Sequence, residues 1–160
     1  MSPFPPTAVL RHRKENLKKC SLRGLEERSD LVFYQYPRDT LPCFSNYIFL
    51  TIKAPVLTRE DASKGLFIVD ATWRLADKIQ KNEQEILKMQ RRSIPPIFRT
   101  AYPRCQRDCI DSSRGLASVE AIHIAYKMLG RSTEGLLDCY YWKEIFFQNN
   151  QHLWQKDTTV

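Results

Sequence analysis

The sequence predicts an α/β fold in which strands and helices alternate, and three observations indicate it. Short runs rich in β-branched and aromatic residues recur along the first half of the chain. The central run, Gly65–Asp70, has four consecutive apolar residues and ends on an acidic one, which is typical of a strand buried on both faces. A helical pattern of apolar residues follows directly. A strand, a polar loop and a helix form the unit of a parallel sheet, and ligands bind outside its strand ends.

The elements before the central strand are predicted as follows. Residues 7–10 form a strand that leads into a basic loop, and Ser21 caps a helix after that loop. Residues 31–34 and 47–52 are β-branched and aromatic runs next to proline-containing turns, so both are predicted strands. Residues 58–61 have the composition of a capped start of a short helix.

After the central strand, a long helix is predicted from residue 72 to about residue 91. Residues 93–96 end it, because proline lacks a backbone donor and restricts the residue before it. Residues 99–114 are expected to be irregular, with arginines among aromatic residues, a composition that suits contact with phosphates and bases. A plain surface loop would have the same composition.

Two helices are predicted in the last third of the chain. Ser118 is the expected N-cap of a buried helix, with Glu120 in its first turn and its end at Gly130. A last helix is expected to begin at Ser132. Its aromatic stripe favours a place in the core over a stacking platform.

Length and composition are those of one soluble domain of 160 residues, with 42% hydrophobic and 27% charged residues. The 25 Lys and Arg residues against 18 Asp and Glu give a net charge of +7, so nucleic acid is the leading macromolecular partner. Neither a membrane helix nor a secretory signal is found, and we expect a cytoplasmic protein without membrane contact.

Five cysteines occur without a C-x-x-C pair. In principle a zinc ion could be held by a set drawn from His12, Cys20, Cys43, Cys105 and Cys109. Ordinary reduced thiols are the favoured interpretation, and no metal is expected.

Several catalytic patterns are absent. The chain has no phosphate-binding glycine loop, no G-x-S-x-G and no H-x-x-x-H, and His123 on a largely apolar helix is expected to be structural. Few ionisable catalytic candidates remain beside a basic surface. This combination favours a transferase whose reactivity is carried by a cofactor, with Asp70 and Trp73 as the first residues of its site.

Four separated segments together resemble one family. Residues 15–25 resemble D-P-K-K-C-[ST]-G-x-x-L of the ribosomal RNA aminocarboxypropyltransferases. Residues 69–73 resemble their D-C-S-W, and equally the D-G-T-W of the related DTW-domain transferases that modify tRNA uridine. Residues 100–103 with 115–121 resemble A-A-N-P…K-L-S-[CS]-[VT]-E-A, and residues 140–149 are similar to the closing F-x-W-G-x-x-F-x-x-x-N. Their order and spacing match over nearly the whole chain.

The resemblance implies a SPOUT-like α/β fold, with a parallel-rich sheet flanked by helices and a C-terminal trefoil knot. It divides the single domain into an N-terminal part (residues 1–65), a knotted cofactor-binding part (66–154) and a loose tail (155–160). It further implies a monomer that binds S-adenosylmethionine and transfers its 3-amino-3-carboxypropyl group to N3 of a uridine or pseudouridine, in rRNA rather than tRNA. The alternatives are a SPOUT-type RNA methyltransferase and a non-catalytic RNA-binding or ribosome-assembly module.

The candidate site residues fall into two sets, the cofactor contacts, which the resemblance implies, and the phosphate contacts, which come from the basic segments. The expected cofactor contacts are Ser21, Leu50, Asp70, Trp73, Ala101, Tyr102, Pro103, Leu116, Ala117 and Ser118. The expected phosphate contacts are Arg11, Arg13, Lys18, Lys19, Arg23, Arg99, Arg104 and Arg107.

Asp70, at the strand end, is the expected general base for the N3 proton. It could instead cap the next helix or hold the indole N–H of Trp73, and Trp73 itself could be core. The chain departs from the family pattern at Asn16, Leu17, Leu22 and Tyr102, which marks a divergent branch.

Overall fold

The computed structural model describes residues 4–14, 20–102 and 115–153, apart from the side chain of Trp73. Five strands form one parallel sheet in the order β2-β1-β4-β3-β5. The strands are β1 (Thr7–His12), β2 (Leu31–Tyr36), β3 (Tyr47–Leu50), β4 (Gly65–Asp70) and β5 (Gln90–Arg92). The predicted parallel α/β sheet is confirmed. Its first four strands lie where the sequence predicts them, although β3 stops at Leu50.

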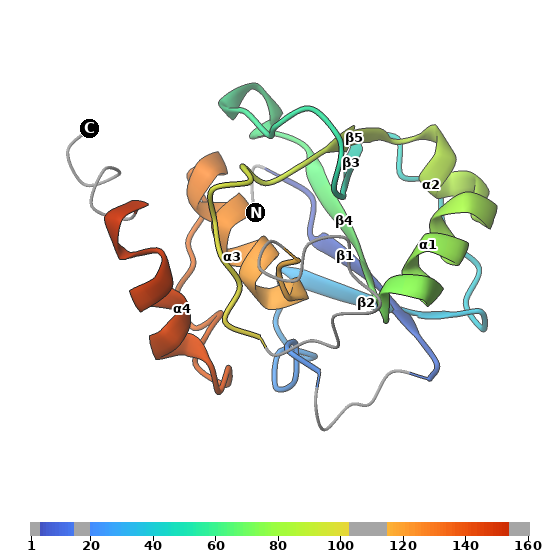
Figure 1. Cartoon of the computed structure of the whole chain (residues 1–160). Helices are drawn as coiled ribbons and strands as arrows, with labels where there is room; N and C mark the ends of the chain where they lie inside the picture. Colours follow the sequence, from blue (N-terminus) through green and yellow to red (C-terminus); the bar gives the residue numbers. More distant parts are fainter. Residues whose placement is uncertain (1–3, 15–19, 103–114, 154–160) are drawn as a thin grey trace.

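Helices cover both faces of the sheet (Figure 1). On one face lie α1 (Trp73–Asn82) and α2 (Gln84–Lys88), and on the other lie α3 (Ser118–Leu129) and α4 (Lys143–Asn149). The alternation of side chains along β4 divides the core. Leu66 and Ile68 belong to the cluster that contains α3, whereas Phe67 packs in the cluster that contains Ile79 and Ile86. The central strand is therefore buried on both faces, as predicted.

The predicted long helix after β4 is wrong in its second half. The backbone is extended at Glu83, between α1 and α2, and residues 90–92 form the edge strand β5 beside β3. Ile79, Ile86 and Met89 are buried in one cluster in this arrangement. A continuous helix would bury the same residues, so apolar spacing alone cannot separate the two structures.

The helix predicted after Ser21 is also wrong. Residues 20–28 form successive turns, in which backbone N–H groups bond to carbonyls three residues earlier. Gly24 has a left-handed backbone with φ of 90°, which interrupts a helix at that point. Instead of capping its own helix, Ser21 accepts a hydrogen bond from the N–H of Val119 at the start of α3, at 3.2 Å.

A single carboxylate sets the start of α3. The N-cap is Ala117, not Ser118 as predicted, and the Glu120 carboxylate accepts the N–H of Ala117 at 2.7 Å. This leaves the Ser118 hydroxyl free to bond elsewhere. The end of α3 at Gly130 agrees with the prediction.

The last helix starts later than predicted. Residues 134–142 are mostly turns, Gly135 has a φ of 80°, and α4 begins at Lys143. Tyr140 and Phe146 are buried as predicted for the aromatic stripe, whereas Tyr141 is 86% exposed. The short helix before β4 is confirmed as the 3-10 helix η1 (Arg59–Asp61). No helix in the described ranges has the length and apolarity to cross a bilayer.

Candidate functional site

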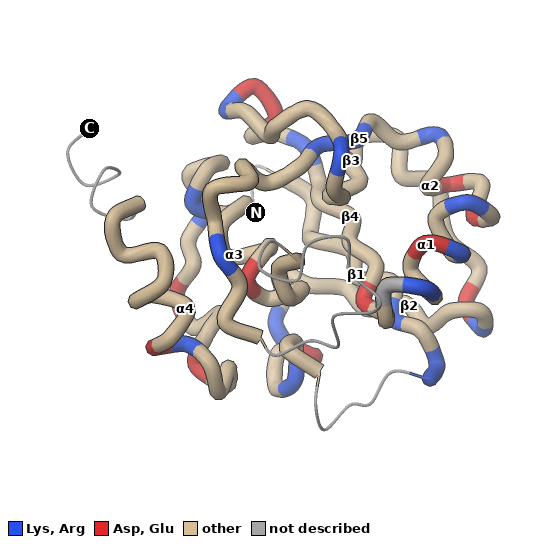
Figure 2. Tube along the Cα trace, in the orientation of Figure 1, with Lys and Arg blue, Asp and Glu red and all other residues tan. Residues whose placement is uncertain are grey.

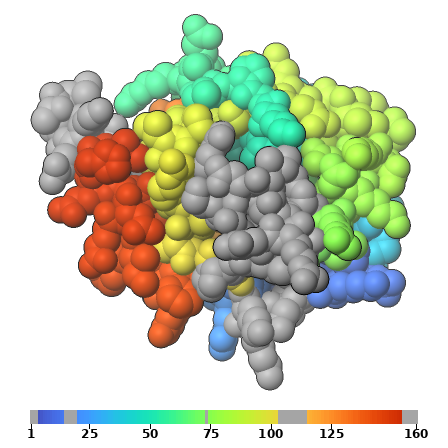
Figure 3. All heavy atoms as spheres, in the orientation of Figure 1, coloured from blue at the N-terminus to red at the C-terminus, as the bar shows by residue number. Residues whose placement is uncertain are grey.

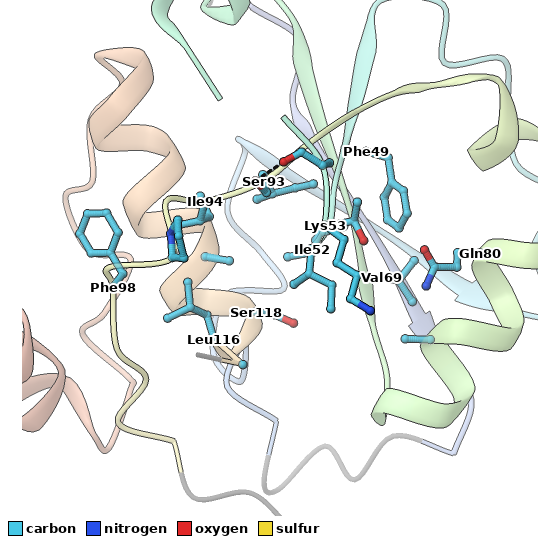
Figure 4. A pocket seen from close by; sticks show the side chains of 18 of the residues that line it. Phe49, Ile52, Lys53, Val69, Gln80, Ser93, Ile94, Phe98, Leu116 and Ser118 are labelled. Atoms are coloured by element: carbon cyan, nitrogen blue, oxygen red, sulfur yellow. Dashed lines mark hydrogen bonds between the residues drawn. The ribbon is translucent and has the colours of Figure 1, made fainter. Parts of the chain in front are cut away.

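A cavity of about 490 Å³ lies at the carboxyl ends of β3 and β4 (Figure 4). The loop after β3 forms one wall, α1 another, and the segment after β5 and the start of α3 complete it. The side chains discussed below come from Leu50, Lys53, Val69, Gln80, Ser93, Ile94, Phe98, Leu116 and Ser118. This is the place where open parallel sheets bind ligands.

The cavity wall is largely apolar and is held in shape by hydrogen bonds. The Ser93 hydroxyl donates to the carbonyl of Ala54 at 2.7 Å, and the Ser93 N–H donates to the carbonyl of Pro55 at 2.8 Å. These bonds join the loop after β3 to the segment after β5. The size and the lining suit a small ligand with an aromatic ring and a few polar groups.

Asp70 is the centre of a buried hydrogen-bond cluster beside this cavity. Its carboxylate accepts bonds from Arg11 Nε at 3.2 Å, from Cys20 Sγ at 3.0 Å and from Ser118 Oγ at 3.0 Å. The strand register sets the first of these, because Arg11 lies directly opposite Asp70 in the parallel pair of β1 and β4. Asp70 therefore connects both central strands to the start of α3.

The cluster fixes the protonation state of its thiol. Burial, and then the negative charge and hydrogen bond of Asp70, raise the pKa of Cys20 to about 12. Cys20 therefore stays protonated at neutral pH and donates to the carboxylate.

Arg11 belongs to this cluster and not to the exposed basic surface expected from the sequence. Its side chain is 13% exposed, its guanidinium pairs with Asp70, and it lies 4.7 Å from the centre of the Phe33 ring. Arg11 is therefore placed to hold Asp70, and its guanidinium is not free for a phosphate.

Glu120 holds together the two loops that the sequence assigned to the cofactor. Its fully buried carboxylate accepts bonds from Thr100 Oγ1 at 2.6 Å, the Ala101 N–H at 2.8 Å, the Ala117 N–H at 2.7 Å and the Tyr140 hydroxyl at 2.9 Å. Sequence reasoning gave this residue only a helix-end role. The signal that could have revealed more is an acidic residue among apolar ones on a buried helix.

Asn150 fixes the same segment against α4. Its side-chain oxygen accepts the Arg99 N–H at 2.8 Å, and its amide donates to the Arg99 carbonyl at 2.9 Å. Figure 3 shows residues 93–102 (yellow) lying along α4 (red). The bonds from Asn150 therefore stabilise the part of the cavity wall that Ile94 and Phe98 form.

The predicted cofactor residues fall into three groups. Leu50, Leu116 and Ser118 line the cavity. Behind that lining are Ser21, Asp70, Ala101 and Ala117, each joined by a hydrogen bond to α3 or to Glu120, and Tyr102, which packs against the core. Pro103 and the side chain of Trp73 lie outside the described residues.

The predicted phosphate contacts are only partly described. Arg13, Arg23 and Arg99 are exposed. Lys18, Lys19, Arg104 and Arg107 lie outside the described residues. Arg99 Nη1 donates to the carbonyl of Pro96 at 3.2 Å, which places its guanidinium next to the cavity wall.

A group of cations surrounds His12 at the end of β1. Burial, and then the charges of Lys14, Arg13 and Lys78, lower the pKa of His12. Lys78 lies on α1, so this group joins the end of β1 to the helix that forms a wall of the cavity. Figure 2 shows Lys and Arg residues (blue) at the end of β1 and along α1. The phosphate contacts expected from the sequence did not include Lys14 and Lys78.

The structure bears on two expectations from the sequence, a structural role for His123 and the absence of a metal site. His123 is buried against the rings of Phe146 and Phe147, and burial, followed by Lys127 and Lys143, lowers its pKa to about 4. This agrees with a structural histidine. No group of three metal-ligating side chains occurs among the residues that the structure describes. That part of the chain does not include Cys105 and Cys109.

Comparisons with known proteins give one structural match. No protein-family model matches the chain, and no curated protein matches it. It is similar to the solved structure of "the SAM-dependent rRNA:acp-transferase Tsr3 from Vulcanisaeta distributa", with a TM-score of 0.71 and 22% sequence identity. The match covers 98% of this chain and 84% of that chain, and it shows that the two share their fold.

Proposed function

We propose that this chain is an S-adenosylmethionine-dependent transferase that moves the 3-amino-3-carboxypropyl group to a uridine or pseudouridine N3 of RNA, and more specifically of rRNA. One observation carries the proposal. Two of the segments that resemble the aminocarboxypropyltransferase motifs, residues 69–73 and 115–121, contribute to the lining of one cavity at the strand ends, in a fold shared with Tsr3. Tsr3 is described as an rRNA:acp-transferase that depends on the same cofactor.

The residues of the cavity fit this cofactor. Leu50, Ile94, Phe98 and Leu116 offer apolar surface for an adenine ring, and Ser118 offers a hydroxyl at the start of α3. When bound, S-adenosylmethionine supplies an electrophilic carbon on a sulfonium sulfur. The chain's own contribution is to orient that carbon and to exclude water, since the reacting carbon is selected by geometry.

Asp70 is proposed chiefly as the anchor of this site. Three donors already occupy its carboxylate, and it holds Ser118 at the edge of the cavity. The role as general base stays a proposal: the N3–H of the target base would have to replace Cys20 or Ser118 as a donor to Asp70.

We propose that RNA lies across the cations that surround His12 and continues over the mouth of the cavity. Arg13, Lys14 and Lys78 are exposed and have no ion pair within the described residues, while Arg99 lies at the far wall of the cavity. Such contacts position the backbone without reading its sequence. RNA affinity should therefore fall steeply with salt.

The remaining parts of the proposal come from the sequence resemblance. They are a trefoil knot in the part from residue 66 to 154, a monomeric state and a cytoplasmic location. The anchoring of two segments by Glu120 is compatible with a knotted cofactor site, because it places residues 100–101 against the start of α3.

The test begins with calorimetric titration of the whole chain with S-adenosylmethionine. The second step is incubation with rRNA and cofactor labelled either in the methyl group or in the carboxyl group. Transfer of the carboxyl label alone supports the proposal, and transfer of the methyl label alone would make the protein a methyltransferase. Salt-sensitive RNA binding without cofactor binding would instead indicate a non-catalytic RNA-binding module.

A further inference from the structure

Lys53 is an isolated charge in the wall of the cavity. Of the described residues that line the cavity, Lys53 alone has an ionisable side chain. Its neighbours in the lining are apolar residues, a few hydroxyl groups and Gln80. Lys53 is also exposed, so its ammonium is accessible to the charged end of a ligand in the cavity.

The backbone holds Lys53 in an unusual conformation. Its φ is 55°, the single described non-glycine residue in the left-handed region. Residues other than glycine reach this region at a cost, and such positions cluster at functional sites. In Figure 4 its side chain extends from the loop after β3 into the cavity, between Ile52 and Val69. Within the described residues no carboxylate pairs with the Lys53 ammonium.

The charges of the proposed cofactor match this arrangement. S-adenosylmethionine carries two cationic groups, the sulfonium and the α-ammonium, and a single anion, the α-carboxylate. The cation of Lys53 favours an orientation in which this one anion faces it and the two cationic groups point away. That carboxylate is part of the group that would be transferred.

We propose that Lys53 binds the α-carboxylate of S-adenosylmethionine and so makes the site specific for a carboxylate-bearing chain. The inference rests on the proposed function, which it deepens by naming a specificity-determining residue. Neither the sequence patterns nor the family resemblance drew attention to Lys53. Its role is to orient the chain through the carboxylate, and no covalent step involves the amine.

The test compares two ligands that differ in one group. The whole chain and its Lys53→Met variant are titrated calorimetrically with S-adenosylmethionine and with decarboxylated S-adenosylmethionine, which lacks the carboxylate. Met keeps most of the length of the side chain and removes the charge. We expect the variant to bind S-adenosylmethionine about tenfold more weakly and the decarboxylated ligand no more weakly, since a hydrogen bond between charged groups is lost only with the former.

Two further variants complete the experiment. Lys53→Arg keeps a cation and should restore much of the preference for the carboxylate. Lys88→Met removes an exposed cation on α2 that does not line the cavity, and it should leave both affinities unchanged. Thermal unfolding of each variant confirms that it is folded.

The other outcomes overturn the proposal in distinguishable ways. Equal weakening of both ligands by Lys53→Met would assign Lys53 a packing role. Unchanged cofactor affinity with weaker binding of an RNA oligonucleotide would make Lys53 a phosphate contact. In both cases the proposed function stands. Failure of the unmodified chain to bind either ligand would remove the proposed function and this inference together.

Discussion

The ion pair between Arg11 and Asp70 is predicted to be a structural anchor that stabilises the fold. Both side chains are nearly buried, with 13% and 7% of their surfaces exposed, and they join the two central strands. In Asp70→Asn the guanidinium loses its charged acceptor, because the oxygen that accepts from both Arg11 and Cys20 becomes a neutral amide oxygen. The amide N–H₂ takes the place of the other oxygen and faces Ser118, whose hydroxyl can accept as well as donate. The substitution leaves the guanidinium with the half-exposed Glu26 carboxylate, 3.7 Å away, as its ion pair among the described residues, and breaking a buried pair in this way costs about 3 kcal/mol.

The magnitude can be tested with a double-mutant cycle. Asp70→Asn and Arg11→Met should each lower the free energy of unfolding by about 3 kcal/mol, a fall in Tm of roughly 6–12 °C for a chain of this size. The double variant should lose less than the sum, with a coupling energy of about 2 kcal/mol, because the second substitution removes the stranded charge. Urea unfolding measures all four proteins at constant slope.

A surface ion pair supplies the matched control. Lys81 and Asp77 are 2.9 Å apart on α1 with 70% and 45% of their side chains exposed. Lys81→Met should change stability by no more than about 0.5 kcal/mol. If the cycle on Arg11 and Asp70 gave a coupling as small as that, the cluster would not be an anchor.

The same Asp70→Asn protein separates anchoring from catalysis. An anchor predicts loss of stability together with weaker cofactor binding, because Ser118 and the start of α3 lose their acceptor. Normal stability and normal cofactor affinity, with no transfer in a single-turnover assay, would instead identify Asp70 as the general base.

Three further predictions concern buried groups. Glu120→Gln should lower the free energy of unfolding, measured in urea, by about 2–3 kcal/mol and weaken cofactor binding, because one amide oxygen cannot accept all four donors. Unchanged cofactor affinity would show that Glu120 does not position the two loops for the cofactor. In the native protein at pH 8, iodoacetamide should label the exposed Cys43 and Cys139. It should label the buried Cys20, whose pKa is about 12, only after urea unfolds the chain. Labelling of Cys20 without urea, detected by mass spectrometry, would contradict its place in the hydrogen-bond cluster of Asp70. Because the pKa of folded His123 is about 4, below its ordinary value, the unfolded chain binds the extra proton as pH falls below about 6.5. The free energy of unfolding should therefore drop by about 2 kcal/mol from pH 7 to pH 5. If a His123→Leu variant showed the same drop, His123 would not be its cause.

The sequence predicted the sheet well because its central strands are buried on both faces. An uninterrupted apolar run such as residues 66–69 has few alternative structures in a chain of this composition. The predictions failed where two structures bury the same residues. A continuous helix would bury Ile79, Ile86 and Met89, and so does the observed arrangement of helices followed by an edge strand. Only the pairing of residues 90–92 with β3 decides between the two structures.

The site was predictable only where the family resemblance touched the cavity. Of the expected cofactor contacts, Leu50, Leu116 and Ser118 line the cavity. The roles of Arg11 and Glu120 depend on partners that are distant in sequence. Arg11 bonds Asp70, which is 59 residues away, and Glu120 bonds Thr100, which is 20 residues away. Composition shows that such charges exist, but only the strand register and the packing of α3 show which of them are consumed by internal bonds.

The distribution of charge in the site follows from these internal bonds. Two buried carboxylates, Asp70 and Glu120, meet at the start of α3, and each is surrounded by donors from the chain itself. Their negative charge therefore serves the fold, whereas the described wall of the cavity carries only the cation of Lys53. Substitutions should separate accordingly, because Asp70 and Glu120 govern stability and affinity together while Lys53 changes affinity alone. Because the buried carboxylates hold the cavity in shape, the cavity should form without a ligand. Cofactor binding should then cost little conformational entropy in the residues around the site.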